Sequence, residues 1–195
     1  MKPIKIAQIG TSMNSHGNSI WNSMKKQPEL FELVGYAFPE NEREKFQKNM
    51  KDFAGYREMT VDEILSDPEI EAVAVETEEI YLTKYALMVA RAGKHLHMEK
   101  PGGVGYEAFR ELVGILKEKN LTFTLGYMYR FNPKVKEAFD KVGRGELRDL
   151  RGRGAYGLQA HRRGQGLAEG LPRRHALLSR LSSDRSDLPH SGRAE

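Results

Sequence analysis

The stretch His-Leu-His-Met-Glu-Lys-Pro-Gly-Gly, residues 95–103, combines a short apolar strand with a charged turn. Residues 95–98 are predicted to form a buried strand that ends on Glu99, Lys100 and Pro101. A lysine is rarely placed in a protein core unless its charge is paired. Lys100, at the mouth of a core strand, is therefore a candidate for binding or chemistry. The alternative is a solvated loop lysine that pairs with Glu99.

Short apolar runs alternate with helical segments on both sides of this stretch. Strands are predicted at residues 4–9, 33–38, 70–75, 95–98 and 121–125. Helices are predicted at residues 17–26, 41–51, 60–65, 80–92, 104–119 and 133–142. Asn41 is a plausible cap of the second helix, and Thr60 with Glu63 predicts a capping box for the third. This alternation indicates an α/β fold with a doubly wound parallel sheet.

Several polar or glycine residues follow the predicted strands directly. They are Gly10, Thr77, Glu99 with Lys100, and Gly126 with Tyr127. Ligands of open parallel sheets bind outside the carboxyl ends of the strands. We therefore expect these residues to line one edge of the sheet.

The turn after the first strand stands where a dinucleotide fingerprint would stand. Only Gly10 fits the pattern of glycines, because Ser12 and Ser15 occupy the other two glycine positions. A serine hydroxyl can donate a hydrogen bond to phosphate, so a cofactor site remains open, beside the alternative of a plain strand–turn–helix. The candidate cofactor contacts in this turn are Gly10, Thr11, Ser12, Met13 and Asn14.

The end of the second strand leaves the choice of cofactor open. An acid that binds the adenosine ribose is expected there, but the position holds Phe38, followed by Pro39 and Glu40. Glu40 is one candidate for the ribose, whereas Arg43 would favour a 2′-phosphate. Both NAD and NADP remain candidate cofactors.

Composition divides the chain near residue 150. Residues 151–195 hold nine arginines, no lysine and four acids, a net charge of +5, and they lack Val, Ile, Phe, Trp and Met. We expect a dinucleotide-binding domain at 1–148 and a basic tail rich in Arg, Gly and Ser at 149–195. The chain has no cysteine and no apolar run near 18 residues, so we expect a cytoplasmic protein without a membrane partner.

Two segments resemble the Gfo/Idh/MocA family of oxidoreductases, named after glucose-fructose oxidoreductase and inositol dehydrogenase. They are residues 92–101, which include Glu99-Lys100-Pro101, and residues 126–133, Gly-Tyr-Met-Tyr-Arg-Phe-Asn-Pro. The resemblance covers residues 4–148. It implies a Rossmann-like domain, NAD or NADP as cofactor, and hydride transfer between the nicotinamide and a small sugar or polyol substrate.

The same resemblance implies roles for individual residues. Lys100 would be the catalytic residue, placed between the nicotinamide and the reacting carbon. Glu99 would fix its ammonium and contact the nicotinamide side, and Pro101 would follow a cis peptide bond. Thr77 would contact the cofactor, although Glu78 replaces the proline usual in that turn. Arg130 would contact a cofactor phosphate, or cap the next helix.

The family continues into a second, mostly antiparallel α+β substrate domain, which this reading frame does not show. If the first base of each tail codon is dropped, the codons of residues 172–175 permit Pro-Gly-Gly-Met. Those of residues 180–186 then permit Gly-Cys-His-Leu-Ile-Asp-Leu, and the last stretch permits Arg-Ile-Gln-Gly-Glu. These strings resemble the family's glycine-rich segment and its catalytic histidine motif. We therefore expect a frameshift between about residues 147 and 153, which would make the tail an out-of-frame remnant.

Two functions follow as expectations. The first is an NAD(P)-dependent oxidoreductase whose substrate domain is missing or truncated, so that the chain itself lacks turnover and forms a homo-oligomer only if that domain is present. The second is a nucleotide-sensing module with a basic arm that binds nucleic acid, although we do not expect a nucleic-acid partner. No metal site is expected, because His95 and His97 alternate within a strand and are interpreted as packing residues.

Overall fold

A computed structural model describes residues 2–146 of the 195-residue chain. Its strands are β1 (Ile4–Ile9), β2 (Phe31–Ala37), β3 (Ala72–Val75), β4 (His95–Met98) and β5 (Phe123–Leu125). Its α-helices are α1 (Gly17–Lys25), α2 (Glu42–Lys45), α3 (Val61–Ser66), α4 (Leu82–Arg91), α5 (Tyr106–Glu118) and α6 (Pro133–Gly143). Two 3₁₀ helices are η1 (Gln47–Phe53) and η2 (Met128–Arg130).

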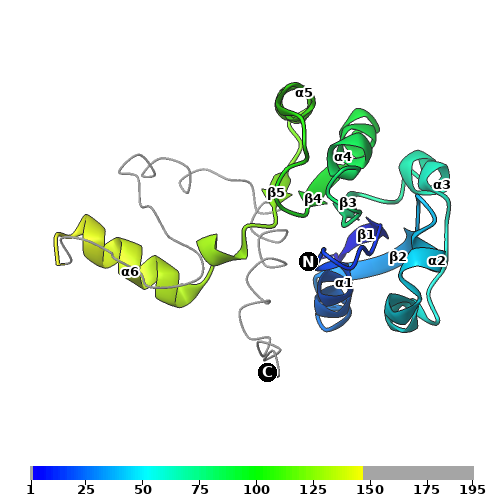
Figure 1. Ribbon diagram of the computed structural model, residues 1–195, viewed down its shortest axis with the longest axis horizontal. Coiled ribbons are helices and arrows are strands. Elements are labelled where there is room, and N and C mark those ends of the chain that lie inside the picture. The colour runs from blue at the N-terminus through cyan, green and yellow to red at the C-terminus, as the bar shows by residue number, and fades with distance from the viewer. Residues whose placement is uncertain (1, 147–195) are drawn as a thin grey trace.

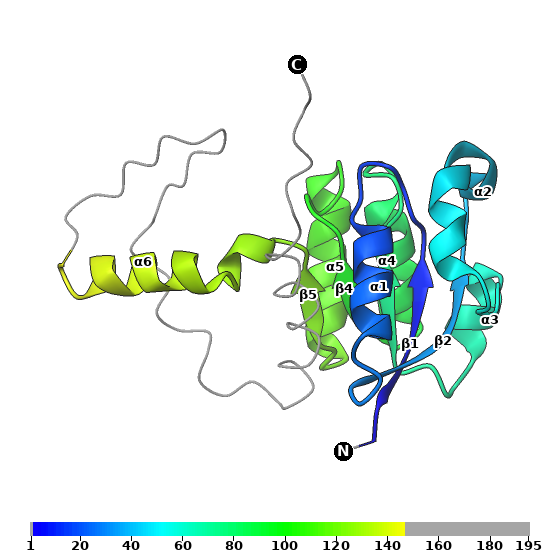
Figure 2. The ribbon, with the colours of Figure 1, turned by 90° about the horizontal axis from the view of Figure 1, so that it is seen from below.

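The five strands form one parallel sheet in the order β2-β1-β3-β4-β5. The order reverses between β1 and β3, which creates the switch point at which parallel sheets bind ligands. Helices α3, α4 and α5 cover one face of the sheet, and α1 with η1 covers the other (Figure 1). The predicted doubly wound α/β fold is confirmed, and in Figure 2 the strands rise together beside α1 and α4.

Each face of the sheet has its own core. Under α3, α4 and α5 the core is aliphatic and includes Val73, Val75, Leu96 and Leu112, all without exposed surface. Under α1 and η1 it is aromatic, because Trp21 packs against Phe53 with ring centroids 4.8 Å apart. Burying apolar area on both faces explains why the strands are short runs with little polar alternation.

The predicted helix at 41–51 is wrong in its middle. The chain forms the four-residue α2, breaks at Phe46 and continues as the 3₁₀ helix η1. Side chains of α1 bind the backbone carbonyls here: Asn18 Nδ2 donates to Asn49 O at 2.9 Å and Trp21 Nε1 donates to Asp52 O at 3.0 Å. These tertiary bonds replace part of the helical ladder. Asn41 takes the left-handed conformation and makes no side-chain cap bond.

Other boundaries shift by a few residues. The capping box at Thr60 is confirmed, since its hydroxyl accepts the Glu63 amide while the Glu63 carboxylate accepts the Thr60 amide. The short helix η2 was not predicted, and α6 extends away from the sheet (Figure 1, Figure 2). Across residues 2–146, no helix is long and apolar enough to cross a membrane.

Candidate functional site

The turns after β1, β3, β4 and β5 meet at the carboxyl edge of the sheet. Ser12 in the first turn donates its amide to the carbonyl of Glu76, which follows β3, at 3.0 Å. The amide of Glu99 after β4 bonds Val75 O at 3.0 Å, and the amide of Gly126 after β5 bonds Met98 O at 2.8 Å. The edge predicted from the sequence is therefore assembled by backbone hydrogen bonds.

Gly10 permits the closest contact at this edge. Its φ is +90°, and an added Cβ would lie 2.6 Å from the amide nitrogen and the methyl group of Thr77. Only glycine adopts this φ without strain and has no Cβ that would clash with Thr77. Thr77, itself 1% exposed, is thus packed against the turn after β1.

In the turn after β1, the polar groups of Thr11 and Ser12 are hydrogen-bonded within the protein, whereas the next residues face solvent. The amide of Thr11 donates to Glu42 Oε2 at 2.9 Å, and its hydroxyl donates to Asn18 Oδ1 at 2.6 Å. Ser12 is buried, and its hydroxyl accepts the Asn14 amide at 3.2 Å. Met13, in contrast, is 74% exposed. The tip of the turn, at Met13 and Asn14, is thus the part that faces solvent.

Glu99 links this turn to Lys100. Its buried carboxylate accepts the backbone amide of His16 at 3.2 Å and lies 2.9 Å from His16 Nδ1. Its other oxygen accepts the amide of Lys100 at 2.8 Å. A Cβ on Gly126 would lie 3.1 Å from this oxygen, so only a glycine fits comfortably beside it. Glu99 therefore fixes the backbone on which the lysine stands.

The residues after Lys100 are held just as firmly. The Lys100–Pro101 peptide bond is cis, as the resemblance implied. Thr83 of α4 donates its hydroxyl to Gly102 O at 3.0 Å, and Tyr127 donates its hydroxyl to Pro101 O at 3.2 Å. Side chains from α4 and from the turn after β5 thus fix the loop from Glu99 to Gly103, and such support is typical of preorganised sites.

The ammonium of Lys100 is less constrained than its backbone. Its side chain is 36% exposed, and Nζ lies 3.8 Å from Glu79 Oε1 in the loop before α4. The hydrogen bonds described for Glu99 go to backbone amides and to His16, and its expected role toward the ammonium stays a prediction. Lys100 therefore extends a partly exposed ammonium from a firmly held loop.

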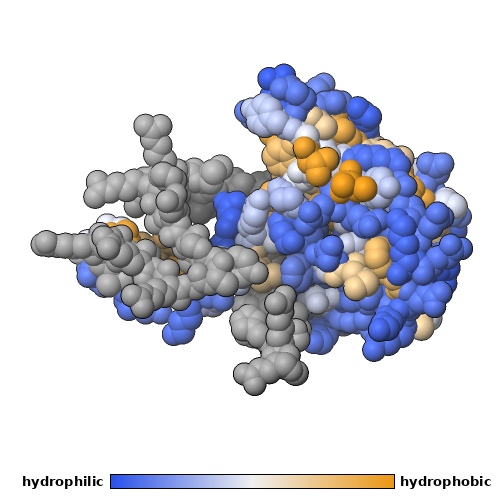
Figure 3. Space-filling view, in the orientation of Figure 1, coloured by the Kyte–Doolittle hydropathy of each residue, from blue (hydrophilic) through white to orange (hydrophobic). Residues whose placement is uncertain are grey.

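Apolar side chains surround the same edge. Ile80 and Val104 are 60% and 75% exposed, and Tyr106 at the start of α5 is 74% exposed. The space-filling view shows apolar surface beside α4 and α5 (Figure 3). Ile80 follows β3, and Val104 and Tyr106 follow β4, so all three belong to segments that leave the sheet at its carboxyl edge.

The remaining candidates lie elsewhere or are already engaged. Arg130 lies on η2, is exposed, and donates its amide to the carbonyl of Tyr127 at 3.1 Å; its contact with a cofactor phosphate stays a prediction. Glu40 accepts Tyr85 OH at 2.7 Å and pairs with Lys84, and Arg43 pairs with Glu58.

The two strand histidines have partners inside the fold. His97, without exposed surface, lies 3.4 Å from Glu76 Oε1, and His95 Nδ1 accepts the Thr122 amide at 3.0 Å. Within residues 2–146 no group of three or more acids or histidines is placed to hold a metal ion.

Sequence reasoning missed two residues of the site. His16 is the N-cap residue of α1 and makes no side-chain cap hydrogen bond. Its Nδ1 instead lies 2.9 Å from the carboxylate of Glu99, which is 83 residues further along the chain. Glu42 is fully buried, and burial raises its pKa from 4.5 to about 8 despite the amide of Thr11. A histidine directly before a helix and an acid within a charged helix are both common in proteins, so neither residue stood out in the sequence.

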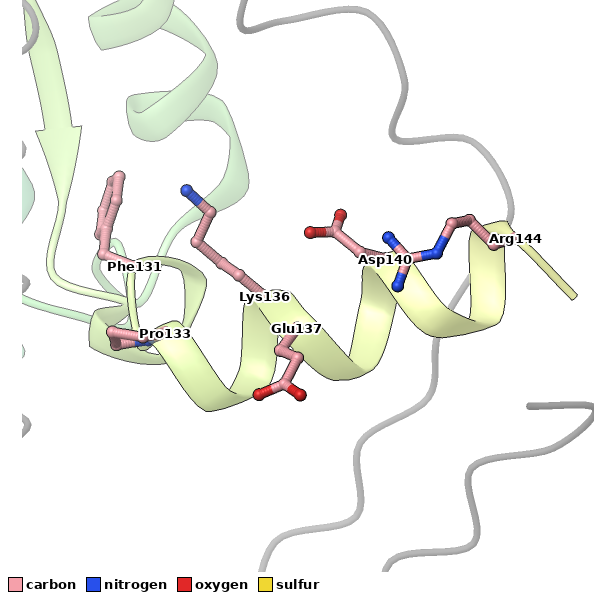
Figure 4. Close-up of a pocket in the computed structure, with 6 residues that line it drawn as sticks. All are labelled: Phe131, Pro133, Lys136, Glu137, Asp140 and Arg144. Carbon is pink, nitrogen blue, oxygen red and sulfur yellow. The ribbon is translucent and has the colours of Figure 1, made fainter. Parts of the chain in front are cut away.

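A hollow of about 370 Å³ lies away from this edge, on η2 and α6 (Figure 4). It is lined by Phe131, Pro133, Lys136, Glu137, Asp140 and Arg144. Its Glu137 points away from Lys136 and Asp140 (Figure 4). None of the candidate site residues lines it, so the site is assigned to the sheet edge.

Known proteins match the part of the chain that carries this edge. A family model for oxidoreductases with an NAD-binding Rossmann fold matches residues 4–127. An uncharacterised oxidoreductase of Rhizobium meliloti is 36% identical over 90 residues, which are 46% of this chain and 27% of that protein. The levoglucosan dehydrogenase of Pseudarthrobacter phenanthrenivorans is 31% identical over 105 residues, which are 52% of this chain and 27% of that protein.

Among solved structures, scyllo-inositol dehydrogenase from Lactobacillus casei, with bound NAD(H) and scyllo-inositol, shares the fold. Its TM-score is 0.63 at 24% identity, over 76% of this chain and 43% of that chain. The matched segment spans about a quarter of the length of the two curated relatives. Since the family model covers more than half of the chain, the protein belongs to the Gfo/Idh/MocA oxidoreductase family, with its NAD-binding Rossmann fold.

Proposed function

We propose that residues 2–146 bind NAD or NADP along the carboxyl edge of the sheet. We also propose that in the whole protein Lys100 serves hydride transfer between the nicotinamide and a sugar or polyol alcohol. The observation that carries this is the rigid loop from Glu99 to Gly103, which holds Lys100 beside the turn after β1. The names of the relatives, levoglucosan dehydrogenase and scyllo-inositol dehydrogenase, favour this substrate class.

The turn after β1 suits a pyrophosphate in several respects. Gly10 has no Cβ, so the turn after β1 packs directly against Thr77 in the turn after β3. The start of α1 lies directly behind the exposed tip at Met13 and Asn14, and helix N-termini favour anions. Ser12 and Ser15 stand where the fingerprint has glycines, and their hydroxyls stabilise the turn itself. The Ser12 hydroxyl accepts the Asn14 amide at 3.2 Å, and the Ser15 hydroxyl donates to the Ser12 carbonyl at 3.1 Å.

The chain's own residues supply the acid–base part of the reaction. A bound nicotinamide accepts or donates the hydride. The Lys100 ammonium donates a hydrogen bond to the substrate oxygen and stabilises negative charge there. During reduction Nζ of Lys100 gives a proton to the substrate oxygen as the hydride arrives, and during oxidation the same proton returns to Nζ. Glu99, Thr83 and Tyr127 keep the lysine backbone in one position throughout.

The basic tail at 149–195 lies outside the described residues, and its interpretation remains a proposal. We propose that it is an out-of-frame copy of the start of the substrate domain, because the shifted frame permits a whole ordered motif. The 195-residue chain is then expected to bind the cofactor without oxidising alcohols. If the tail is translated out of frame, its arginines were not selected to bind nucleic acid, so they give no reason to expect a nucleic-acid partner.

Calorimetric titration of the purified 195-residue chain with NADH and NADPH tests the proposed cofactor site. Binding of either cofactor, weakened at least tenfold by Gly10→Ala and unchanged by Gly105→Ala, is the expected result. Gly105 is the matched control, because nothing lies within 4 Å of a Cβ added there. Absence of binding to both cofactors by a folded parent chain would disprove the proposal. Salt-sensitive binding of DNA, lost on deletion of residues 151–195, would favour the nucleic-acid alternative instead.

A further inference from the structure

Phe38 occupies the position where an acid commonly binds the adenosine ribose, and it is used for packing. Its ring centroid lies 4.7 Å from that of Tyr36 and 4.9 Å from that of Phe53. Both partners belong to the aromatic core under α1. Phe38 is thus committed to the core, and recognition of the ribose has to come from another residue.

Glu40 and Arg43 are poorly placed for that role. The Glu40 carboxylate accepts the hydroxyl of Tyr85 at 2.7 Å and pairs with Lys84, so α4 already holds it. Arg43 pairs with Glu58 and lies 5.8 Å from the ring centroid of Phe38. A 2′-phosphate would have to compete with Glu58 for this guanidinium.

Glu42 is the acid that reaches the phosphate turn. Its Oε2 accepts the amide of Thr11 at 2.9 Å, directly after Gly10. The residue has no exposed surface, and its Oε1 has no hydrogen-bond partner within residues 2–146. The backbone amide of Glu78, after β3, also lowers its pKa. The carboxyl therefore stands between the turns after β1 and β3, at the switch point of the sheet.

The backbone before Glu42 explains how it gets there. Glu40 and Asn41 both have φ of 58°, a conformation that is uncommon for residues other than glycine. Two such residues in succession turn the chain back from the end of β2 toward β1. Strained backbone of this kind gathers at functional sites.

We propose that Glu42 binds the ribose diol of the adenosine half of the cofactor and makes the chain selective for NAD over NADP. This inference rests on the proposed cofactor site and deepens it. Oε2 keeps the Thr11 amide, and Oε1, which lacks a partner, accepts the ribose hydroxyls after α2 shifts outward. A 2′-phosphate is rejected, because its negative charge would lie against the carboxylate.

The pH dependence of binding follows from the charge of Glu42. Burial raises its pKa to about 8, repulsion from Glu78 adds to this, and Lys45 acts in the opposite direction. Ribose hydroxyls donate hydrogen bonds to the ionised form, so NADH binding and loss of the proton favour each other. NADH affinity should therefore rise between pH 6.5 and 8.5, and the preference over NADPH should widen.

The test compares Glu42→Gln with the parent chain by calorimetric titration of NADH and NADPH. Glutamine can still accept the Thr11 amide, so the turn should stay intact, which the thermal midpoint verifies. We expect NADH to bind at least tenfold more weakly, because charge-assisted hydrogen bonds are lost. NADPH should bind more tightly, because the charge that repels the 2′-phosphate is gone, and the pH dependence of NADH binding should disappear.

Two further variants make the outcome decisive. Glu44→Gln removes an exposed acid of the same helix and should leave both affinities unchanged. Glu40→Gln removes the competing candidate. Weaker NADH binding in Glu40→Gln but not in Glu42→Gln would overturn the inference, as would tighter binding of NADPH than of NADH by the parent. If the folded parent binds neither cofactor, the proposed cofactor site itself fails.

Discussion

Gly103 is the residue at which the lysine loop tolerates change least. Its φ is +95°, and an added Cβ would lie 1.7 Å from the hydroxyl of Thr83, which holds Gly102. We predict that Gly103→Ala destabilises the fold by about 2 kcal/mol and lowers the thermal midpoint by about 4–8 °C. Gly105→Ala, at the N-cap of α5, should cost less, about 0.5–1 kcal/mol, because glycine is preferred over alanine at that position. Thermal unfolding followed by circular dichroism measures both; equal midpoints would contradict the prediction.

Glu42 makes the stability of the fold depend on pH. Its pKa is about 8 in the folded chain against 4.5 ordinarily, so the folded chain holds a proton that the unfolded chain has lost between these values. Stability should therefore fall as pH rises from 4.5 to 8 and then level off. At pH 7 the free energy of unfolding should be about 3 kcal/mol lower than below pH 4.5 because of Glu42 alone.

We predict that Glu42→Gln is more stable than the parent by about 1–3 kcal/mol at pH 8, with a smaller advantage at pH 5. Urea unfolding at the two pH values measures this, with Glu44→Gln as the control. The same advantage at both pH values would show that proton binding by Glu42 is not its cause.

The sequence predicted residues whose role depends on the local chain. Gly10 and Lys100 directly follow apolar strands, and strand ends are readable from periodicity. His16 and Glu42 could not be found in this way, because their partners Glu99 and Thr11 are distant in sequence. Contacts of that kind come from tertiary packing, on which a single sequence carries little information.

Among the elements, α5 offers the clearest test of local preference. Gly114 lies inside this helix, is exposed, and a Cβ added there would meet nothing within 4 Å. Alanine suits a helix interior better, because it loses less backbone entropy on folding. Gly114→Ala should stabilise the chain by about 0.5–1 kcal/mol, measurable as a shift of the urea midpoint at constant slope. A lower midpoint would mean that the helix face of Gly114 is in contact with something.

Strands and long helices were predicted to within a few residues, whereas the segment 41–51 was not. Its pattern is amphipathic and rich in charges, which favours one helix. Instead, Asn18 and Trp21 of α1 take the carbonyls of Asn49 and Asp52. Tertiary hydrogen bonds outweighed propensity there, because propensity differences amount to a few tenths of a kcal/mol per residue.

At the scale of the whole molecule, the frameshift that we propose would remove the substrate domain on which catalysis depends. We predict that removing one base between the codons of residues 147 and 153 yields a longer protein that oxidises a sugar or polyol with NAD(P). The unaltered gene should yield no turnover. Coupled absorbance assays of both proteins, with Lys100→Met in the longer one as the inactive control, measure this. Turnover by the 195-residue chain would contradict the proposal that its frame is broken.

The chain has one tryptophan, Trp21, and its indole donates to Asp52 O in the segment that follows α2. Phe53 and Tyr56 border the same ring, with centroids 4.8 and 5.1 Å away. Tryptophan emission of this protein therefore comes from a single indole, which lies close to the helix that we propose to shift when a ribose binds. Binding of oxidised cofactor, which does not itself fluoresce, can thus be followed by the emission wavelength of Trp21.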